Sequence, residues 1–471
     1  MTLPWIRRAP GVPYFETDAG DPWTPIGQND ALPWPELRGV MHGDLAPVAR
    51  HLAWLRESGV TCLRLMLEYA EGDDCYLEAP DGTWNERLVA AWDALVPLCE
   101  RAGLRLLLTP YDTYFNWVRF DAHPYNAANG GPCPDRTQFL INPETRARIK
   151  RRLEFAARRW SGTGAVFAWD IWNEMHPVQG GDVPGCFEDF IGDVSPFLRG
   201  VERAAHGRAH PQCASVFGPE LDWKPWLREP IFRHRELDFA STHLYAEGSI
   251  DDPTDTVEPA LAVGRLMADA LGEIADQRPL FDSEHGPIHT FKDRGITLAE
   301  AFDDEYFRHT AWAHLASGGA GGGMRWPNRS PHVLTPGMRR LQRAMADFLP
   351  LVDWQRFGRR CLNEALRVDG EGVAALGCGD ADQAVLYLLR TGPLLADGRL
   401  DPGVGEGVRV LAPGLGAGPF EALLWDTSAG RVLGEAPVRR TEEGVVVEVP
   451  PFGTDVAVAV RRALAPPARL D

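Results

Sequence analysis

The sequence predicts an α/β protein whose main part is a (β/α)8 (TIM) barrel, followed by a small C-terminal all-β sandwich. Eight short apolar runs alternate with amphipathic stretches between residues 25 and 348, a repeat typical of parallel strands joined by helices. No G-x-G-x-x-G motif follows the first run, which argues against an open doubly wound sheet. After residue 351 the helical periodicity ends, and short strand-like runs separated by Gly and Pro replace it.

The predicted barrel strands are short apolar runs that end on polar or aromatic residues. The fourth, read from AVFAWDI, is apolar on both faces, as a strand buried in a parallel sheet would be. The eight predicted strands cover residues 25–28, 61–67, 104–109, 165–171, 215–218, 238–242, 279–283 and 321–325.

The predicted helices carry apolar residues at intervals of three or four. In the first, Val48, Leu52 and Leu55 share one face. Asp44 is its expected N-cap, and Gly59 its expected end. The fifth helical stretch is the least regular. The predicted helices cover residues 44–58, 85–101, 143–160, 187–204, 225–233, 257–275, 298–316 and 336–348.

The sequence divides into an expected barrel domain, residues 1–352, and an expected C-terminal β-sandwich, residues 353–471. The sandwich shows no group of acidic residues that would suggest chemistry, so we expect it to have a packing or accessory role. Its clearest predicted strands cover residues 385–389, 408–411, 421–425, 445–449 and 456–460.

Composition excludes several classes of partner. A net charge of −18 argues against binding to nucleic acid or to an anionic membrane, and favours neutral or cationic substrates. No apolar stretch is long enough to span a bilayer and the N-terminus has no signal-like apolar core, so a cytoplasmic protein is expected, or a secreted one if a signal was removed. The eight cysteines form no C-x-x-C pair, whereas sixteen tryptophans are compatible with a sugar-like ligand.

Glutamates follow two of the predicted strands at the same relative place. Glu174 follows the fourth strand, directly after Asn173, and Glu284 follows the seventh. Cleavage of a glycosidic bond needs two such carboxyl groups, one protonated and one ionised. Arg64 and the hydroxyl of Tyr245 would keep Glu284 ionised, while drier surroundings would keep the proton on Glu174.

Other strand exits supply candidate contacts to a substrate. Asn173 would bind a sugar hydroxyl, Trp326 would lie under the sugar ring, and His243 is either a contact or a hydrogen-bonded core residue. A metal cluster around His285 and His289 matches no known spacing, so neither a metal nor another cofactor is expected. Further candidate contacts are Asn29, Asp112, Trp117 and His176.

These motifs together resemble those of a known group of enzymes. The N-E pair at strand four, H-x-Y at strand six, S-E-H-G at strand seven and R-W at strand eight resemble the clan of retaining (β/α)8 glycoside hydrolases, most closely family 5, over residues 10–350. The resemblance implies that Glu174 is the acid/base and Glu284 the nucleophile. It also implies a supporting shell, which would consist of Arg64, Asn173, His243, Tyr245 and Trp326.

One position departs from the pattern. Family 5 usually has a histidine at the end of strand three, where this sequence has Thr-Pro-Tyr-Asp at residues 109–112. Tyr111 or Asp112 would have to make the contact that this histidine makes to the substrate. The nearest subfamily is therefore left open.

The expected function is that of a retaining β-glycosidase acting on oligosaccharides or glycosides, with carboxyl groups about 5–5.5 Å apart. Long insertions at residues 112–143 and 176–188 would enclose a pocket, which favours an exo-acting, β-mannosidase-like enzyme. The alternatives are an endo-β-1,4-mannanase or β-glucanase, and a non-catalytic carbohydrate-binding barrel. A metal-dependent lyase or aldolase is disfavoured because no strand ends on lysine. The oligomeric state is not predicted.

Overall fold

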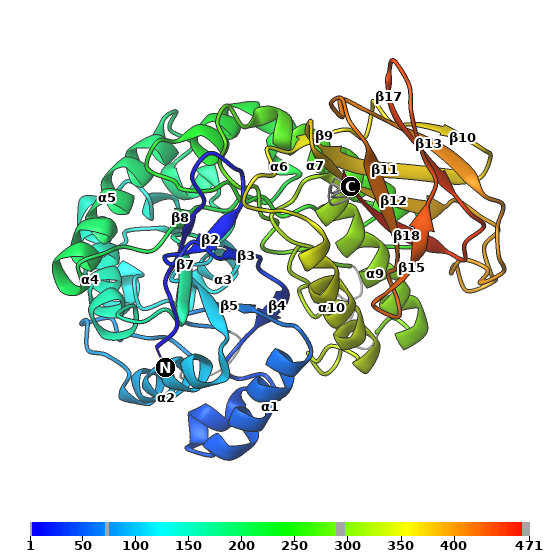
Figure 1. Ribbon diagram of the computed structural model, residues 1–471. Helices are drawn as coiled ribbons and strands as arrows, with labels where there is room; N and C mark the ends of the chain where they lie inside the picture. Colours follow the sequence, from blue (N-terminus) through cyan, green and yellow to red (C-terminus); the bar gives the residue numbers. More distant parts are fainter. Residues whose placement is uncertain (1, 71–74, 289–296, 464–471) are drawn as a thin grey trace.

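The computed structural model describes residues 2–70, 75–288 and 297–463 of the chain. Its centre is a parallel sheet rolled into a barrel, which helices surround and the C-terminal sheets flank on one side (Figure 1). Five strands pair in chain order around the barrel: β4 (Gly27–Asp30), β5 (Cys62–Met66), β6 (Arg105–Thr109), β7 (Val166–Asp170) and β8 (Gln212–Cys213).

The other three barrel positions are held by isolated parallel bridges rather than by long ladders, and the last bridge closes the ring on β4. The predicted barrel is therefore confirmed, although the first and fifth strands lie two or three residues from the predicted places. The bridges run from the fifth strand back to the first: Phe217 to His243, Ala240 to Leu280, His285 to Arg325, and Arg325 to Gln28.

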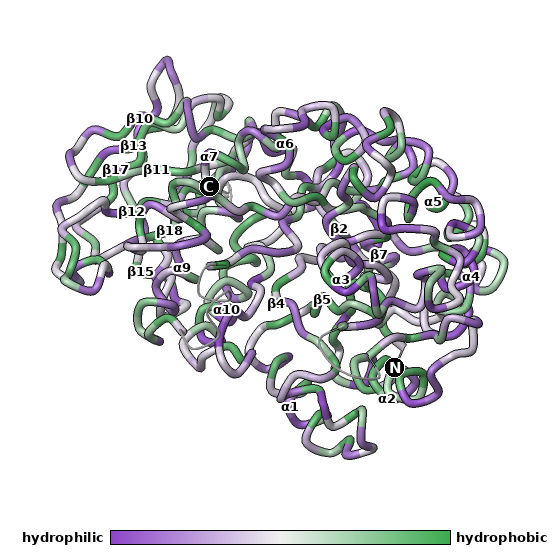
Figure 2. The backbone as a smooth tube through the Cα atoms, turned by 180° about the vertical axis from the view of Figure 1, so that it is seen from behind, coloured by the Kyte–Doolittle hydropathy of each residue, from purple (hydrophilic) through white to green (hydrophobic). Residues whose placement is uncertain are grey.

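Seven of the eight predicted helical stretches form helices near the predicted bounds, and hydrophobic and hydrophilic residues alternate along outer helices such as α1 and α4 (Figure 2). Asp44 is the N-cap of α1, but its side chain makes no capping hydrogen bond. The barrel helices are α1 (Leu45–Glu57), α2 (Glu86–Ala102), α4 (Pro143–Trp160), α5 (Cys186–His206), α7 (Glu258–Glu273), α9 (Glu300–Ser317) and α10 (Pro336–Phe348).

The predicted fifth helix is not continuous, because Pro225 and Pro230 interrupt it. Three short pieces stand in its place: α6 (Glu220–Trp223), η6 (Pro225–Leu227) and η7 (Glu229–Arg233). The other short helices are η1 (Arg38–His42), α3 (Thr113–Val118), η2 (Phe120–Ala122), η3 (Ala127–Asn129), η4 (Arg136–Gln138), η5 (Pro177–Gly180) and η8 (Leu349–Leu351).

A small N-terminal sheet, which the sequence analysis did not anticipate, packs against one end of the barrel. Its antiparallel strands are β1 (Ile6–Arg8), β2 (Phe15–Thr17) and β3 (Pro22–Trp23). The ring of Phe15 lies edge-on against Phe167 at 4.9 Å and against Phe239 at 5.4 Å. Both partners begin barrel strands, so this sheet covers the end of the barrel where the strands start.

The C-terminal region forms two antiparallel sheets, as the sequence predicts. The six-stranded sheet has the order β15-β14-β18-β12-β11-β9, and the four-stranded sheet has the order β10-β13-β17-β16. The strands are β9 (Arg360–Cys361), β10 (Arg367–Asp369), β11 (Val373–Gly379), β12 (Gln383–Arg390), β13 (Val408–Pro413), β14 (Phe420–Asp426), β15 (Arg431–Ala436), β16 (Val438–Arg440), β17 (Gly444–Val449) and β18 (Asp455–Arg462).

The strand β12, inside the six-stranded sheet, is buried on both faces. Along β12, Val385 and Tyr387 belong to the hydrophobic core of the barrel, whereas Leu386 and Leu388 belong to the core between the two C-terminal sheets. The alternation follows from the two-residue period of a strand. The predicted division at residues 352/353 remains a prediction. Among the described residues, no helix has the length and apolar character needed to cross a membrane.

Candidate active site

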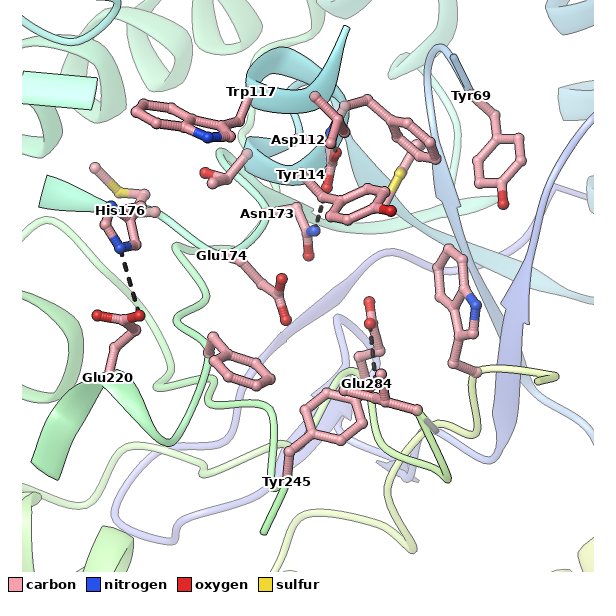
Figure 3. Close-up of a pocket in the computed structure, with 18 of the residues that line it drawn as sticks. Tyr69, Asp112, Tyr114, Trp117, Asn173, Glu174, His176, Glu220, Tyr245 and Glu284 are labelled. Carbon is pink, nitrogen blue, oxygen red and sulfur yellow. Dashed lines mark hydrogen bonds and ion pairs between the residues drawn. The ribbon is translucent and has the colours of Figure 1, made fainter. Parts of the chain in front are cut away.

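The predicted catalytic residues face one cavity at the carboxyl ends of the barrel strands. Glu174 lies four residues beyond β7, and Glu284 lies beside the His285–Arg325 bridge. Both line a cavity of about 630 Å³, and Figure 3 shows their carboxyl groups extending into the same space. The chain thus brings together two acids that are 110 residues apart in sequence, because the barrel closes.

Arg64 lies behind the two glutamates and hydrogen-bonds to four side chains around them. Its side chain is 1% exposed, and it donates hydrogen bonds to Glu284 Oε2 at 2.9 Å and to Asp170 Oδ2 at 2.8 Å. It also donates to the side-chain oxygens of Asn29, at 2.8 Å, and of Asn173. A guanidinium can serve four acceptors because its five N–H groups lie in one rigid plane.

Glu284 is held at both carboxylate oxygens by donors. The Tyr245 hydroxyl donates to Oε1 at 3.0 Å, and Arg64 donates to Oε2. Two donors favour the ionised form of the carboxyl group. The arrangement also fixes the direction in which the carboxylate faces the cavity.

Glu174 has different surroundings. His243 Nδ1 lies 2.8 Å from Glu174 Oε1, and His243 Nε2 lies 3.0 Å from the hydroxyl of Ser283. Glu174 also has a left-handed backbone, with φ at 49°, which is uncommon for a residue with a side chain. Its N–H donates to the hydroxyl of Ser215 at 3.1 Å, and that hydroxyl donates to Asp170. The surrounding structure therefore imposes the backbone that turns this side chain into the cavity.

Burial raises the pKa of both glutamates to about 7. For Glu174, Arg64 opposes this effect, while the charges of Asp170 and Glu220 add to it. For Glu284, His243, Arg64 and Tyr245 oppose the rise and Glu174 adds to it. Arg64 lowers the pKa of Glu284, as the sequence analysis expects, but removal from water has the larger effect and sets the net direction.

The two carboxyl groups are close enough to act on one atom. An oxygen of Glu174, an oxygen of Glu284 and a ring nitrogen of His243 all lie within 4.8 Å of one another. Such a triad could ligate a metal, but Arg64 and Tyr245 already occupy the oxygens of Glu284.

Among the described residues, a second group with metal-ligand spacing consists of Asp30, Glu36 and His51. Arg339 lies 3.6 Å from the carboxylate of Glu36 and already supplies a positive charge there. Of the histidines considered as ligands in the sequence analysis, His285 is fully buried and His289 lies outside the described residues.

Three residues of the predicted site lie behind the cavity rather than on its wall. Asn29 and Arg64 are 1% exposed, and His243 is fully buried. Asn29 donates to the backbone oxygens of Ser283 and Met324, so it links barrel strands. These three side chains orient the residues that do line the cavity.

Asn173 and Asp112 form one unit on the cavity wall. The amide nitrogen of Asn173 donates to Asp112 Oδ1, and Asp112 Oδ2 accepts the N–H of Phe115 at 2.6 Å as the N-cap of α3. Burial raises the pKa of Asp112 to about 7, and the charge of Glu174 adds to this effect. Asp112 therefore follows the third barrel strand and lines the same cavity as the two glutamates.

Both tryptophans predicted to contact the substrate, Trp117 and Trp326, line the cavity. Trp326 packs edge-on against Trp34, with ring centres 5.2 Å apart. Trp117 lies in α3, and the guanidinium of Arg136 stacks on its ring at 4.0 Å. His176 Nε2 lies 3.4 Å from Glu220 Oε1, and burial lowers the pKa of His176.

Sequence reasoning missed the polar residues beneath the pair. Asp170, Ser215 and Ser283 are fully buried and carry the hydrogen bonds that position Glu174 and Arg64. The sequence did point to Asp170, because a charged residue within an otherwise apolar strand needs a partner. Ser283 belongs to the S-E-H-G motif, but the motif gives it no role, and Ser215 leaves no signal because serine occurs widely in strands and loops.

Comparison with known proteins gives matches only among solved structures: no protein-family model and no curated protein matches the sequence. One similar structure is a glycoside hydrolase family 5 protein from Bacteroides vulgatus, with 12% identity, a TM-score of 0.61, and coverage of 98% of this chain and 94% of that chain. A structure described as a glycoside hydrolase has 13% identity, a TM-score of 0.58, and coverage of 98% and 97%.

A glycoside hydrolase family 5 mannosidase from Rhizomucor miehei has 16% identity and a TM-score of 0.53, and covers 75% of this chain and 98% of that chain. The first two matches extend over the C-terminal sheets as well as the barrel. At these identities the similarity establishes the fold. The resemblance noted in the sequence is therefore confirmed at the level of the fold: the chain has the (β/α)8 barrel seen in glycoside hydrolases of family 5, with a β-sandwich after it.

Proposed function

We propose that the protein is a retaining β-glycosidase that works by double displacement. Glu284 attacks the anomeric carbon while Glu174 gives its proton to the departing glycosidic oxygen, so that the aglycone leaves and a glycosyl ester forms. Glu174, now ionised, takes a proton from water. The resulting hydroxide displaces Glu284 from the same carbon, which restores the β configuration and both starting protonation states.

The observation that carries this proposal is the pair of glutamates with unlike partners, in which one carboxyl oxygen of Glu174 lies within 4.8 Å of one carboxyl oxygen of Glu284. This separation supports direct attack, since an inverting enzyme needs about 6.5–9.5 Å to place a water between its carboxyl groups. Two donors on Glu284 favour its ionised form. Among the described residues, the carboxyl group of Glu174 has one hydrogen-bond partner, His243. The single proton that the pair holds near pH 7 is therefore expected on Glu174.

Exo-action on β-mannosides is the finer part of the proposal. Trp117 of the first insertion and His176 at the start of the second line the cavity, which supports an enclosed end. Residues 119–143 and 177–188, the greater part of both insertions, do not line it. The Rhizomucor miehei mannosidase, of which one structure is a complex with mannosyl-fructose, supports a mannoside substrate. An endo-β-1,4-mannanase or β-glucanase is the alternative.

The test is a panel of nitrophenyl β-glycosides followed by NMR of the first product formed. A β-anomer from a β-mannoside is expected, and an α-anomer would refute retention. Polymeric mannan would separate the two modes of action, since release of oligosaccharides without mannose would refute exo-action.

Two variants assign the roles. Glu284→Ala with azide should yield an α-glycosyl azide, and Glu174→Ala with azide and an activated aryl glycoside should yield the β-azide. Glu220→Gln is the matched control, because it alters a carboxylate of the same cavity outside the pair. A Glu284→Gln variant that retained full hydrolysis would exclude the mechanism, and an inactive wild-type protein that still binds oligosaccharide would favour the non-catalytic alternative.

A further inference from the structure

One wall of the cavity belongs to the loop that links the sixth barrel strand to α7. Tyr245 and Asp251 of this loop line the cavity, and Tyr245 donates its hydroxyl proton to Glu284. Tyr306 of α9 donates to the backbone oxygen of Ile250 at 3.1 Å. The position of this loop therefore sets the position of a donor to the proposed nucleophile.

The far end of the loop is fastened at Thr256, which is fully buried and uses all of its polar groups. Its hydroxyl donates to Glu305 Oε1 at 2.7 Å, and its carbonyl oxygen lies 2.8 Å from His309 Nδ1. Its N–H donates to the carbonyl oxygen of Gly398 at 3.1 Å. Two of these partners belong to α9, but Gly398 lies in the C-terminal region.

Gly398 is at the tip of a hairpin, residues 392–401, that extends from the C-terminal sheets to the barrel. Leu394 pairs with Leu400 across this hairpin. The N–H of Leu400 donates at 2.8 Å to Glu305 Oε1, the same oxygen that binds Thr256. Leu400 is 1% exposed and belongs to the barrel core. The hairpin is thus packed and hydrogen-bonded into the loop's anchor.

The tip has no room for a side chain. Gly398 has φ at +83°, and a Cβ atom there would lie 2.2 Å from the carbonyl oxygen of Thr254. The atom that would have to move is backbone of the loop itself. Close approach of the two backbones therefore explains glycine at this position.

We propose that hairpin 392–401 of the C-terminal region positions one wall of the substrate pocket. The hairpin holds the 246–257 loop in place, and through this loop it holds the wall formed by Tyr245 and Asp251. The expected effect of the hairpin on substrate binding rests on the proposed function. The expected effect on the loop does not. The C-terminal region would then affect substrate binding through the loop, and this effect requires no carbohydrate site in the region itself.

The test compares Gly398→Ala with Gly372→Ala. Gly372 also has a left-handed backbone, with φ at +70°, but a Cβ atom there meets nothing within 4 Å. Both variants carry the backbone strain, and only the first pushes on the loop. The measurements are KM and kcat on the best nitrophenyl glycoside, the melting temperature, and hydrogen exchange of the peptide 244–257.

For Gly398→Ala we expect a KM raised about tenfold, as for the loss of one or two hydrogen bonds, and faster exchange in the loop. Gly372→Ala should lose similar thermal stability with unchanged KM and exchange. Equal KM and equal loop exchange in the two variants would overturn the inference. If Gly398→Ala does not fold, Thr256→Val, which removes only the hydroxyl bond to Glu305, takes its place with the same two readouts.

The failure of the proposed function can be told apart from the failure of the inference. A wild-type protein that hydrolyses no glycoside would refute the function. Loop exchange would then decide the inference by itself, because it needs no substrate.

Discussion

Replacing Tyr245 by phenylalanine removes one hydrogen bond from the proposed nucleophile and little else. The hydroxyl donates to Glu284 Oε1 at 3.0 Å, and the ring packs 5.4 Å from that of Phe217. Tyr245 is 3% exposed, so phenylalanine keeps the packing. Arg64 remains on the other carboxylate oxygen.

The effect on acidity follows from the sign of the interaction. Burial raises the pKa of Glu284 to about 7, and the hydroxyl of Tyr245 opposes that rise by stabilising the ionised form. Its removal must therefore raise the pKa further. A hydrogen bond to a charged group contributes about 1.5–3 kcal/mol, and 1.36 kcal/mol corresponds to one pH unit, so we expect the acid limb to move up by about one unit or more.

The assay is kcat/KM against pH for the wild type, Tyr245→Phe and a control, Tyr114→Phe. At pH 6 we expect the first variant to lose about tenfold in activity, with a smaller loss at higher pH, where Glu284 is again ionised. Tyr114 lines the same cavity and is 54% exposed, so its variant should leave the acid limb in place. An unmoved acid limb in Tyr245→Phe, or one displaced to lower pH, would refute the reasoning.

Three further results are expected. Arg64→Met leaves Asp170 and Glu284 without their cation and should cost about 3–5 kcal/mol in urea unfolding; a loss below about 1 kcal/mol would contradict the buried network. Glu174 has a pKa raised to about 7 by burial, so its contribution to stability is present below its unfolded pKa and is lost as pH rises through 7. Glu174→Gln should therefore raise the melting temperature more at pH 8 than at pH 5, and the reverse order would refute that sign. Trp326→Ala should raise KM for glycosides about tenfold, because it removes the indole face on which the sugar ring would stack. An unchanged KM would contradict this stacking.

Helices and the barrel repeat could be predicted from the sequence because they depend on local periodicity. Helix α4, for example, begins at Pro143 and ends at Trp160, as its pattern predicts. The first and fifth strands were found only approximately, and the last three lie at the predicted places without forming ladders. They are held by single bridges, such as that of Ala240 with Leu280, and such short contacts leave little pattern in the sequence.

The candidate site was predicted as a set of strand ends, and the barrel brings those ends together. The sequence could not predict which of these side chains reach the cavity surface and which are buried behind it. Arg64 and His243 are buried behind the cavity, because they precede the ends of their strands. Tyr245 comes later in the chain and lines the cavity. The net rise in the pKa of Glu284 could not be predicted for the same reason, since a sequence names the cation beside a carboxylate but not the extent of burial.

The double burial of β12 has a consequence for how the chain is made. Val385 and Tyr387 cover apolar surface of the barrel, and their sheet is completed by β18, near the end of the described chain. A nascent chain that has emerged from the ribosome only as far as α10 therefore still exposes the apolar face of α9, where Trp312 packs against Tyr387 in the complete fold. We therefore expect release of the final strands, rather than completion of the barrel helices, to protect the folding chain against aggregation.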